Sequence, residues 1–206
     1  MLYIVNYKQI LITTIVFLSS IIAQKSYLNN FNPDSLKYKI TYATRCIESP
    51  IIDGKLDDEV WNMAIPQSEF FQLDPIEFGS PSEKTVVRVL YNDHALYISF
   101  ENFDSEPNNI RKPLTRRDAY MDGFASSADY VGFAIDSKND DYNGKWFGVN
   151  AAGVKIDVNV SGNEEYDRSW DAVWDAAVSI TDIGYIVEFM VPFSVFQFEN
   201  KIDQVW

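Results

Sequence analysis

Apolar and polar positions alternate most regularly between residues 174 and 192. Two runs with a period of two flank a turn at 182–184, which contains Gly184. This pattern predicts an antiparallel hairpin with one buried face and one partly hydrated face, which carries Glu188. Pro192 ends the second strand because it has no N–H to donate. The expected buried stripes are Trp174, Ala176, Val178 and Ile180 in the first strand, and Tyr185, Val187, Phe189 and Val191 in the second.

The same period recurs upstream, separated by short polar turns and without a long helical pattern. Such a chain predicts an all-β fold, an antiparallel β-sandwich with one short N-terminal helix. The helix is expected at 57–64, where Asp57 caps its first turn and Trp61 packs into the core. The other expected strands cover 36–44, 84–91, 95–103, 129–136, 145–151 and 154–160.

The first 23 residues have the pattern of a signal peptide. Lys8 supplies a positive charge, an apolar run covers 10–22, and Ala23 offers a small residue for cleavage. The run is short for a membrane span, so an uncleaved anchor is the less favoured alternative. Residues 24–44 are expected to be a flexible lead-in followed by the first strand, and 45–206 to be the sandwich domain. Residues 202–206 resemble the start of an unfinished strand, which indicates a domain truncated at its C-terminal end.

Charge and cysteine content narrow the function classes. The chain of 206 residues has a formal net charge of -13 and no basic stripe, which argues against a nucleic-acid partner. Export would place the chain in an oxidising space, yet Cys46 is its only cysteine and cannot form an internal disulfide. We expect Cys46 to be a small buried hydrophobe, and the single histidine, His94, to be a solvated turn residue.

Catalytic and metal motifs are hard to find. The sequence has no nucleophile-elbow, zinc-protease or phosphate-loop motif. Glycoside hydrolysis needs only two carboxylates, and thirty Asp and Glu residues leave that alternative open. Residues 139–144 resemble part of a calcium-binding loop in their oxygen-bearing side chains, but a hairpin turn at Asn143 and Gly144 explains this sequence better. A structural Ca²⁺ elsewhere stays open, and a non-enzyme is favoured.

Aromatic side chains are more suggestive, because flat rings stack on the apolar faces of sugars while polar neighbours bind the hydroxyl groups. Half-buried sheets also favour aromatic residues, so a core role is the competing interpretation. Trp174 lies on the apolar side of its strand and is assigned to the core. Trp170 precedes that strand in an acidic loop and is expected to be the more exposed ring. The candidates are Phe124, Tyr130, Trp146, Trp170 and Trp174.

Five segments in order resemble the family 9 carbohydrate-binding modules, over about residues 45 to 206. The resemblance is strongest to the version at the N-terminus of exported Bacteroidetes proteins that continue into an outer-membrane-type β-barrel. The matching segments are Ile52-Asp53-Gly54-x-Leu56-Asp57-Asp58-x-x-Trp61, Val87-Arg88-Val89-Leu90-Tyr91 with Ala95-Leu96-Tyr97-Ile98, Leu114-Thr115-Arg116-Arg117-Asp118, Phe147-Gly148-Val149-Asn150-x-x-Gly153, and Ser169-Trp170-Asp171-Ala172-Val173-Trp174.

The resemblance implies a sugar-binding β-sandwich, of a kind usually attached to xylanases or other polysaccharide-degrading proteins. In that family two tryptophans clamp a terminal sugar and Ca²⁺ stabilises the fold. The first clamp tryptophan is expected just before strand 129–136, but residues 124–128 contain no tryptophan. The second is expected in a C-terminal segment that this sequence lacks. The sugar contacts are therefore assigned to Phe124, Trp146 and Trp170, with Arg116, Arg117 and Asp118 as polar partners.

Three functions follow, in order of preference. The first is poly- or oligosaccharide binding by a non-catalytic module linked to extracellular carbohydrate catabolism. The second is a structural accessory domain of an outer-membrane β-barrel without sugar binding, and the third is part of a glycoside hydrolase. All three place the exported chain in the periplasm, in the outer membrane or at the cell surface.

Overall fold

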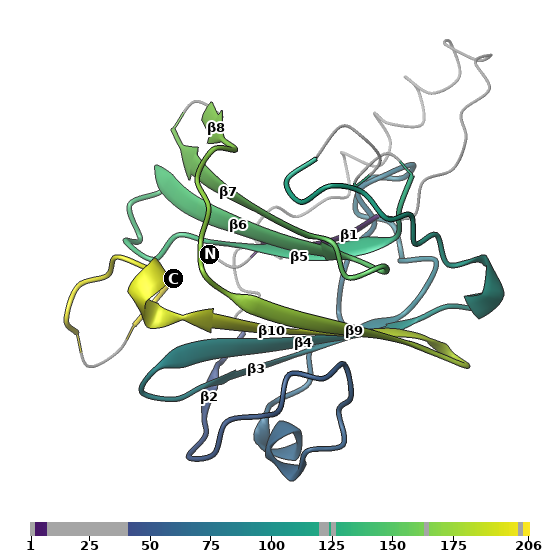
Figure 1. The fold of residues 1–206 in the computed structure, drawn as a ribbon, viewed down its shortest axis with the longest axis horizontal. Helices are drawn as coiled ribbons and strands as arrows, with labels where there is room; N and C mark the ends of the chain where they lie inside the picture. Colours follow the sequence, from purple (N-terminus) through teal and green to yellow (C-terminus); the bar gives the residue numbers. More distant parts are fainter. Residues whose placement is uncertain (1–2, 8–40, 120–123, 125–126, 163–164, 202–203) are drawn as a thin grey trace.

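Two five-stranded sheets pack face to face in the computed structural model, which describes residues 3–7, 41–119, 124, 127–162, 165–201 and 204–206 (Figure 1). All neighbouring strands are antiparallel except β2 and β3. Sheet A has the order β1 (Tyr3–Tyr7), β5 (Tyr130–Ile135), β6 (Asn143–Asn150), β7 (Lys155–Ser161) and β8 (Glu165–Asp167). Sheet B has the order β2 (Thr44–Arg45), β3 (Thr85–Tyr91), β4 (Ala95–Phe103), β10 (Gly184–Pro192) and β9 (Asp175–Thr181). The all-β sandwich expected from the sequence is confirmed.

The helical elements whose bounds are described are short 3-10 turns. They are η2 (Glu59–Met63), η3 (Pro107–Asn109) and η5 (Phe193–Val195). The short helix expected at 57–64 is therefore present as η2, in which Trp61 is buried. No helix in the described part of the chain is long and apolar enough to cross a membrane.

Several boundaries differ from the expectation. The turn between β5 and β6 ends before Asn143, because Asp140 accepts hydrogen bonds from the backbone N–H groups of Tyr142 and Asn143 at 2.9 and 2.7 Å. The Asn143–Gly144 pair therefore lies in β6, and the hairpin turn expected there is wrong. Residues 204–206 form no strand; Trp206 instead packs on Phe196 with 5.3 Å between ring centroids.

The N-terminal expectations are only partly covered by the described residues. Residues 8–40, which hold most of the predicted signal peptide and lead-in, lie outside them. Of the first strand expected at 36–44, the described part contributes only β2. Within the first 23 residues, Tyr3–Tyr7 forms β1, which pairs with β5 at the edge of sheet A. The signal peptide stays a prediction.

Aromatic rings fill the space between the sheets. Phe133 of sheet A packs on Phe189 of sheet B, with 5.2 Å between centroids and an interplanar angle of 80°. Phe189 also stacks on Trp174 at 5.7 Å. Trp174 is 4% exposed, so its assignment to the core is confirmed. These contacts between sheets hold the two layers in register.

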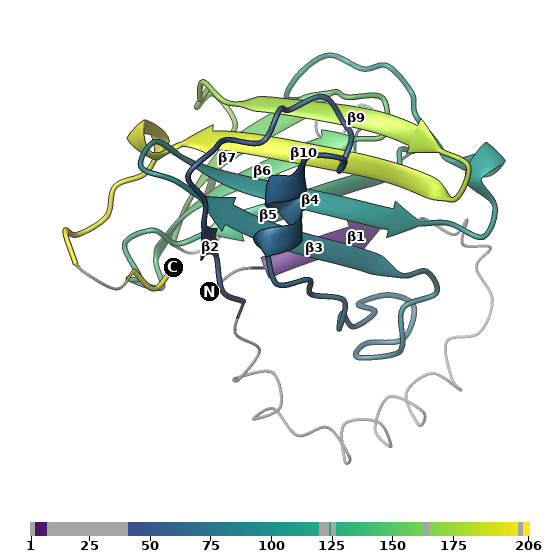
Figure 2. The same cartoon turned by 90° about the horizontal axis from the view of Figure 1, so that it is seen from below.

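The outer face of sheet B is covered as well. Figure 2 shows η2 lying across this face, which carries Cys46, Trp61 and Tyr97 in a second buried cluster. Glu188 projects from the same face of β10, and its side chain is fully buried. The partly hydrated environment expected for Glu188 is wrong, because the segment from Cys46 to Ala64 folds over it.

Candidate functional site

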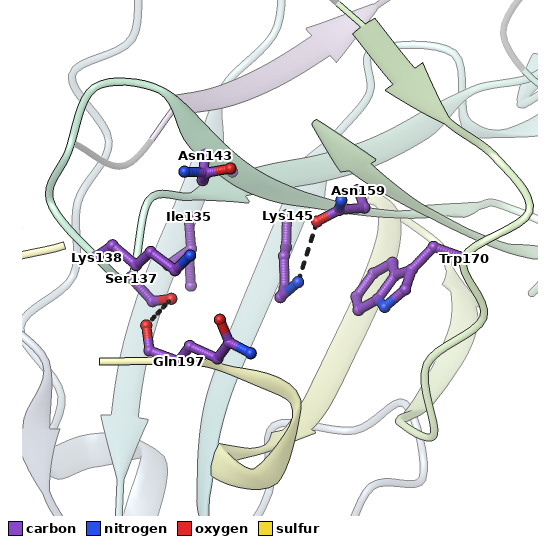
Figure 3. Close-up of a pocket in the computed structure, with 9 residues that line it drawn as sticks. Ile135, Ser137, Lys138, Asn143, Lys145, Asn159, Trp170 and Gln197 are labelled. Carbon is purple, nitrogen blue, oxygen red and sulfur yellow. Dashed lines mark hydrogen bonds between the residues drawn. The ribbon is translucent and has the colours of Figure 1, made fainter. Parts of the chain in front are cut away.

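A pocket lies at one end of the sandwich. Its volume is about 220 Å³. Figure 1 shows that the chain between β8 and β9 and the C-terminal segment in yellow both run past this end of the two sheets. The residues that line the pocket are Ile135, Ser137, Lys138, Asn143, Gly144, Lys145, Asn159, Trp170 and Gln197 (Figure 3).

Strand register explains why three of these side chains meet. Lys145 of β6 lies directly opposite Ile135 of β5 on one side and Asn159 of β7 on the other. Directly paired residues project from the same face of a sheet. Two positions further along β6, Phe147 projects from that face into the core between the sheets. The pocket is therefore the end of the inter-sheet space, where polar side chains replace the core residues.

Trp170 forms one wall of the pocket. Its indole is half-buried and packs against the edge of Phe147, with 5.9 Å between ring centroids and an interplanar angle of 68°. The Lys145 Nζ lies 4.3 Å from the centroid of the indole ring, a distance typical of a cation–π contact. The expectation that Trp170 is the more exposed ring holds in part, since the core supports it from behind.

Hydrogen bonds fix the polar part of the lining. The Lys145 ammonium donates to Asn159 Oδ1 at 3.1 Å, and the Ser137 hydroxyl donates to the backbone oxygen of Gln197 at 2.8 Å. Burial, together with the positive charge of Lys138, lowers the pKa of Lys145. The arrangement presents amine and amide groups beside an aromatic wall, which is suited to a ligand with hydroxyl groups and an apolar edge.

Trp146 lies on the opposite face of sheet A, because it alternates with Lys145 and Phe147 along β6. Its indole covers Gly132 and Gly148, where a Cβ atom would collide with the ring. Phe124 meets the edge of this indole at 6.4 Å and is fully buried. Phe124 is therefore a core residue, and its assignment as a sugar contact is wrong.

The three polar candidates are occupied elsewhere. Arg117 donates to Asp157 Oδ1 at 2.6 Å and to the backbone oxygen of Ala172 at 3.2 Å, while Asp118 Oδ1 accepts from the Asp157 N–H at 3.1 Å. Burial raises the pKa of the Asp118 carboxyl. The Arg116 side chain is exposed. None of these three residues lines the pocket, so the structure does not place them beside Trp170.

A family model decides what kind of domain this is. The model for the carbohydrate family 9 binding domain-like family matches residues 52–205. The chain belongs to this family. No curated protein matches the sequence in a direct comparison.

Solved structures agree with the family in fold. A family 9 carbohydrate-binding module from Caldicellulosiruptor kristjanssonii, solved in complex with cellotriose, superimposes with a TM-score of 0.52 at 18% identity, covering 74% of this chain and 67% of that chain. A protein from Bacteroides uniformis ATCC 8492, described as a "putative carbohydrate-binding protein", gives a TM-score of 0.57 at 14% identity, covering 79% and 76%. At these identities the likeness establishes the sandwich fold.

For this family 9 domain, sequence reasoning missed most of the pocket lining. Lys138, Lys145, Asn159 and Gln197 were not among the candidate residues, and only Trp170 was. One signal was available for Lys145, since it occupies a position in the stripe that continues through Phe147 and Val149, both fully buried. A charged side chain in an otherwise buried stripe indicates the point where the core gives way to a site.

A cluster of acidic side chains of the kind that holds Ca²⁺ is not found among the described residues. No group of three or more His, Cys, Asp or Glu side chains there is close enough to hold a metal ion. The carboxylate of Asp140 is engaged with Asn143 and the turn backbone, and that of Asp157 with Arg117. The structural Ca²⁺ that the family resemblance implies therefore stays a prediction.

Proposed function

We propose that this domain is a non-catalytic carbohydrate-binding module that holds a sugar residue in the pocket beside Trp170. The observation that carries the proposal is a half-buried indole facing a polar pocket at the end of a family 9 sandwich. An indole offers an apolar surface to the C–H side of a sugar ring. Amide and amine groups of Asn143, Asn159 and Lys145 are available to its hydroxyl groups.

The size of the pocket favours a single terminal residue. Its volume of about 220 Å³ is below the roughly 300 to 1,000 Å³ of pockets that enclose larger ligands. A chain that continues beyond that residue would extend into solvent. The cellotriose complex of the Caldicellulosiruptor kristjanssonii module supports an oligosaccharide as the ligand class.

Binding is favoured over hydrolysis by the placement of the carboxylates. Hydrolysis of a glycosidic bond needs two carboxyl groups on either side of it. None of the nine described residues that line the pocket is Asp or Glu. The buried carboxylates of Asp157 and Glu188 accept hydrogen bonds from other parts of the fold.

The cellular context belongs to the same proposal. The apolar run at 10–22 supports export through a signal peptide to the periplasm, the outer membrane or the cell surface. There the module would assist extracellular carbohydrate catabolism, on xylan or another polysaccharide, within a Bacteroidetes-type protein that continues into a β-barrel.

The test is a titration of the domain with cello- and xylo-oligosaccharides, in which binding is measured by calorimetry and by tryptophan fluorescence. We expect saturable heat and a fluorescence change, because a sugar against Trp170 alters the surroundings of its indole. No heat and no fluorescence change at millimolar sugar would overturn the proposal for those ligands.

A second candidate is the accessory domain of a barrel, and an exposed apolar segment favours it. Between residues 63 and 76 several large apolar side chains face solvent, and such clusters commonly mark interaction surfaces. They are Met63, Ile65, Phe71, Leu73 and Ile76. Crosslinking of a full-length protein should join this segment to the downstream region if the role is structural, and should find no such link if it is not.

A further inference from the structure

The pocket carries a charge opposite to that of the chain. The chain has a formal net charge of -13. Two of the nine residues that line the pocket, Lys138 and Lys145, are cations, and none is an acid. A ligand that reaches the pocket therefore meets a local positive field inside an acidic surface.

Lys145 has no carboxylate partner in the described part of the chain. Its ammonium is half-buried and contacts only neutral groups, the Asn159 amide oxygen and the face of the Trp170 indole. Removing a cation from water without an opposite charge is unfavourable, because the hydration that it loses is not replaced. The lowered pKa of Lys145 reflects this cost.

Lys138 adds a second positive charge to the same space. It follows β5 in the β5–β6 turn, where its charge helps to lower the pKa of the Asp140 carboxyl, although the described residues form no ion pair with it. Figure 3 shows its side chain at the left of the pocket, below Asn143, with the amine near Ile135 on the side that faces Lys145. The charge of Lys138 contributes to the lowered pKa of Lys145, so the two cations are close enough to repel one another. An anion between them would relieve this repulsion and replace the lost hydration of Lys145.

We propose that the preferred ligand of this pocket is an acidic sugar residue, whose anionic group lies between the amines of Lys138 and Lys145 while its ring packs against Trp170. This inference rests on the proposed function, since it specifies the sugar that the same pocket takes. The shared chemistry is a sugar that carries a negative group, either the carboxylate of a uronate or a sulfate ester. Asn159 and Gln197 remain at the pocket wall for the neutral hydroxyl groups.

The experiment compares three ligand sets by calorimetry on the same protein: neutral xylo-oligosaccharides, uronate-containing oligosaccharides and sulfated oligosaccharides. We expect about tenfold tighter binding of one acidic set than of the neutral set at low salt. The preference should shrink when ionic strength rises from about 0.01 M to about 1 M, because salt screens the exposed part of the interaction. The tighter of the two acidic sets identifies the source of the negative group.

Charge-removing variants test the location. Lys138→Gln should reduce the preference for the acidic sugar several-fold and leave affinity for the neutral sugar nearly unchanged. Lys145→Gln should weaken binding of the neutral sugar as well, because Lys145 contacts Asn159 and the Trp170 indole, and should weaken binding of the acidic sugar several-fold more. Lys138 is exposed, so its variant keeps the test decisive if Lys145→Gln weakens the fold. Lys112→Gln is the matched control, because Lys112 is exposed and lies far from the pocket. Its neighbour Arg111 donates a hydrogen bond to Asp129, which precedes the first residue of β5, whereas the pocket residue Ile135 is the last residue of β5. This variant makes the same change in net charge and should keep the preference.

The outcomes separate this inference from the proposed function. Equal affinity for neutral and acidic sugars overturns the acidic-sugar inference and leaves sugar binding in place. An acidic preference that survives both Lys138→Gln and Lys145→Gln also overturns it, because the negative group then binds elsewhere. Binding of neither class overturns both. If inorganic sulfate or acetate binds as tightly as the acidic sugar, the pocket is a general anion site, and the inference is overturned.

Discussion

The indole N–H of Trp61 donates a 2.8 Å hydrogen bond to Oε1 of Glu188, which lies 127 residues later in the chain. The other carboxylate oxygen of Glu188 accepts from the backbone N–H groups of Asp53 and Gly54 at 3.1 and 2.7 Å. One buried carboxylate thus attaches the N-terminal segment to the outer face of sheet B. Gly54 is required at this contact, because its φ is +84° and a Cβ atom would lie 2.8 Å from the Val178 carbonyl carbon.

We predict that Glu188→Gln destabilises the domain by about 1 to 3 kcal/mol, because its amide NH₂ would face groups that are themselves donors. Denaturant unfolding followed by fluorescence measures this loss. Glu59→Gln is the matched control, since Glu59 lies in the same segment but is exposed. Equal stability of the Glu188→Gln variant and the wild type would contradict the role assigned to this carboxylate.

The same carboxylate should make stability depend on pH in a defined direction. Burial raises the pKa of Glu188 above its ordinary value of 4.5, although the hydrogen bonds from Gly54, Trp61 and Asp53 oppose the shift. A folded-state pKa above the unfolded value contributes stability that is fully present below the unfolded value. That contribution is lost as pH rises through the folded value.

The unfolding free energy of the wild type relative to Glu188→Gln should therefore fall as pH increases from below 4.5. Taking the difference between the two proteins cancels the contributions of the other carboxylates. A difference that is flat, or that rises with pH, would show that the hydrogen bonds outweigh burial.

A second prediction concerns Asp157, which is fully buried and joins the loop before β9 to sheet A. It accepts from Arg117 at 2.6 Å, from the Ala172 N–H at 2.6 Å and from the Trp174 indole at 3.0 Å. Asp157→Asn removes the charge that pairs with Arg117 and places an NH₂ group among donors. We expect a loss of about 2 to 3 kcal/mol in unfolding free energy.

Asp171 offers the control for that variant, because it bonds the same arginine at 2.7 Å but its side chain is 71% exposed. Asp171→Asn should change stability by no more than about 0.5 kcal/mol, as exposed ion pairs are largely screened by solvent. Comparable losses in the two variants would mean that burial does not distinguish the two carboxylates. Thermal unfolding by circular dichroism provides the comparison.

The strands were predictable from the sequence because alternation is a local signal. The hairpin of β9 and β10 and that of β3 and β4 begin and end close to the expected residues. Glu188 was not predictable in this way, because its burial depends on the segment from Cys46 to Ala64 folding over sheet B. The turn before β6 was missed for a related reason. The Asp140 side chain accepts hydrogen bonds from the N–H groups of Tyr142 and Asn143, so the turn ends before Asn143.

The pocket was less accessible to sequence reasoning than the fold. Its wall combines residues from β5, β6 and β7 with Trp170 and Gln197, and Ser137 bonds a residue 60 positions away. Phe124 was misassigned because aromatic type alone does not reveal which face of a sheet is covered. Trp170 was the one pocket residue among the candidates, because it precedes β9 in a polar loop, where the hydrophobic pattern no longer requires a core residue.

The two faces of sheet A can be compared directly by sugar binding, because Trp170 and Trp146 lie on opposite sides of it. We expect Trp170→Ala to reduce oligosaccharide affinity by about two- to tenfold, given the roughly 0.5 to 1.5 kcal/mol that a well-packed aromatic contact contributes. Trp146→Ala should leave affinity unchanged, although it exposes Gly132 and Gly148 and lowers stability. Calorimetry on both variants, with folding checked by circular dichroism, decides between the faces. If Trp146→Ala abolishes binding and Trp170→Ala does not, the sugar binds the outer face of sheet A, and the pocket at the end of the sandwich is not the binding site.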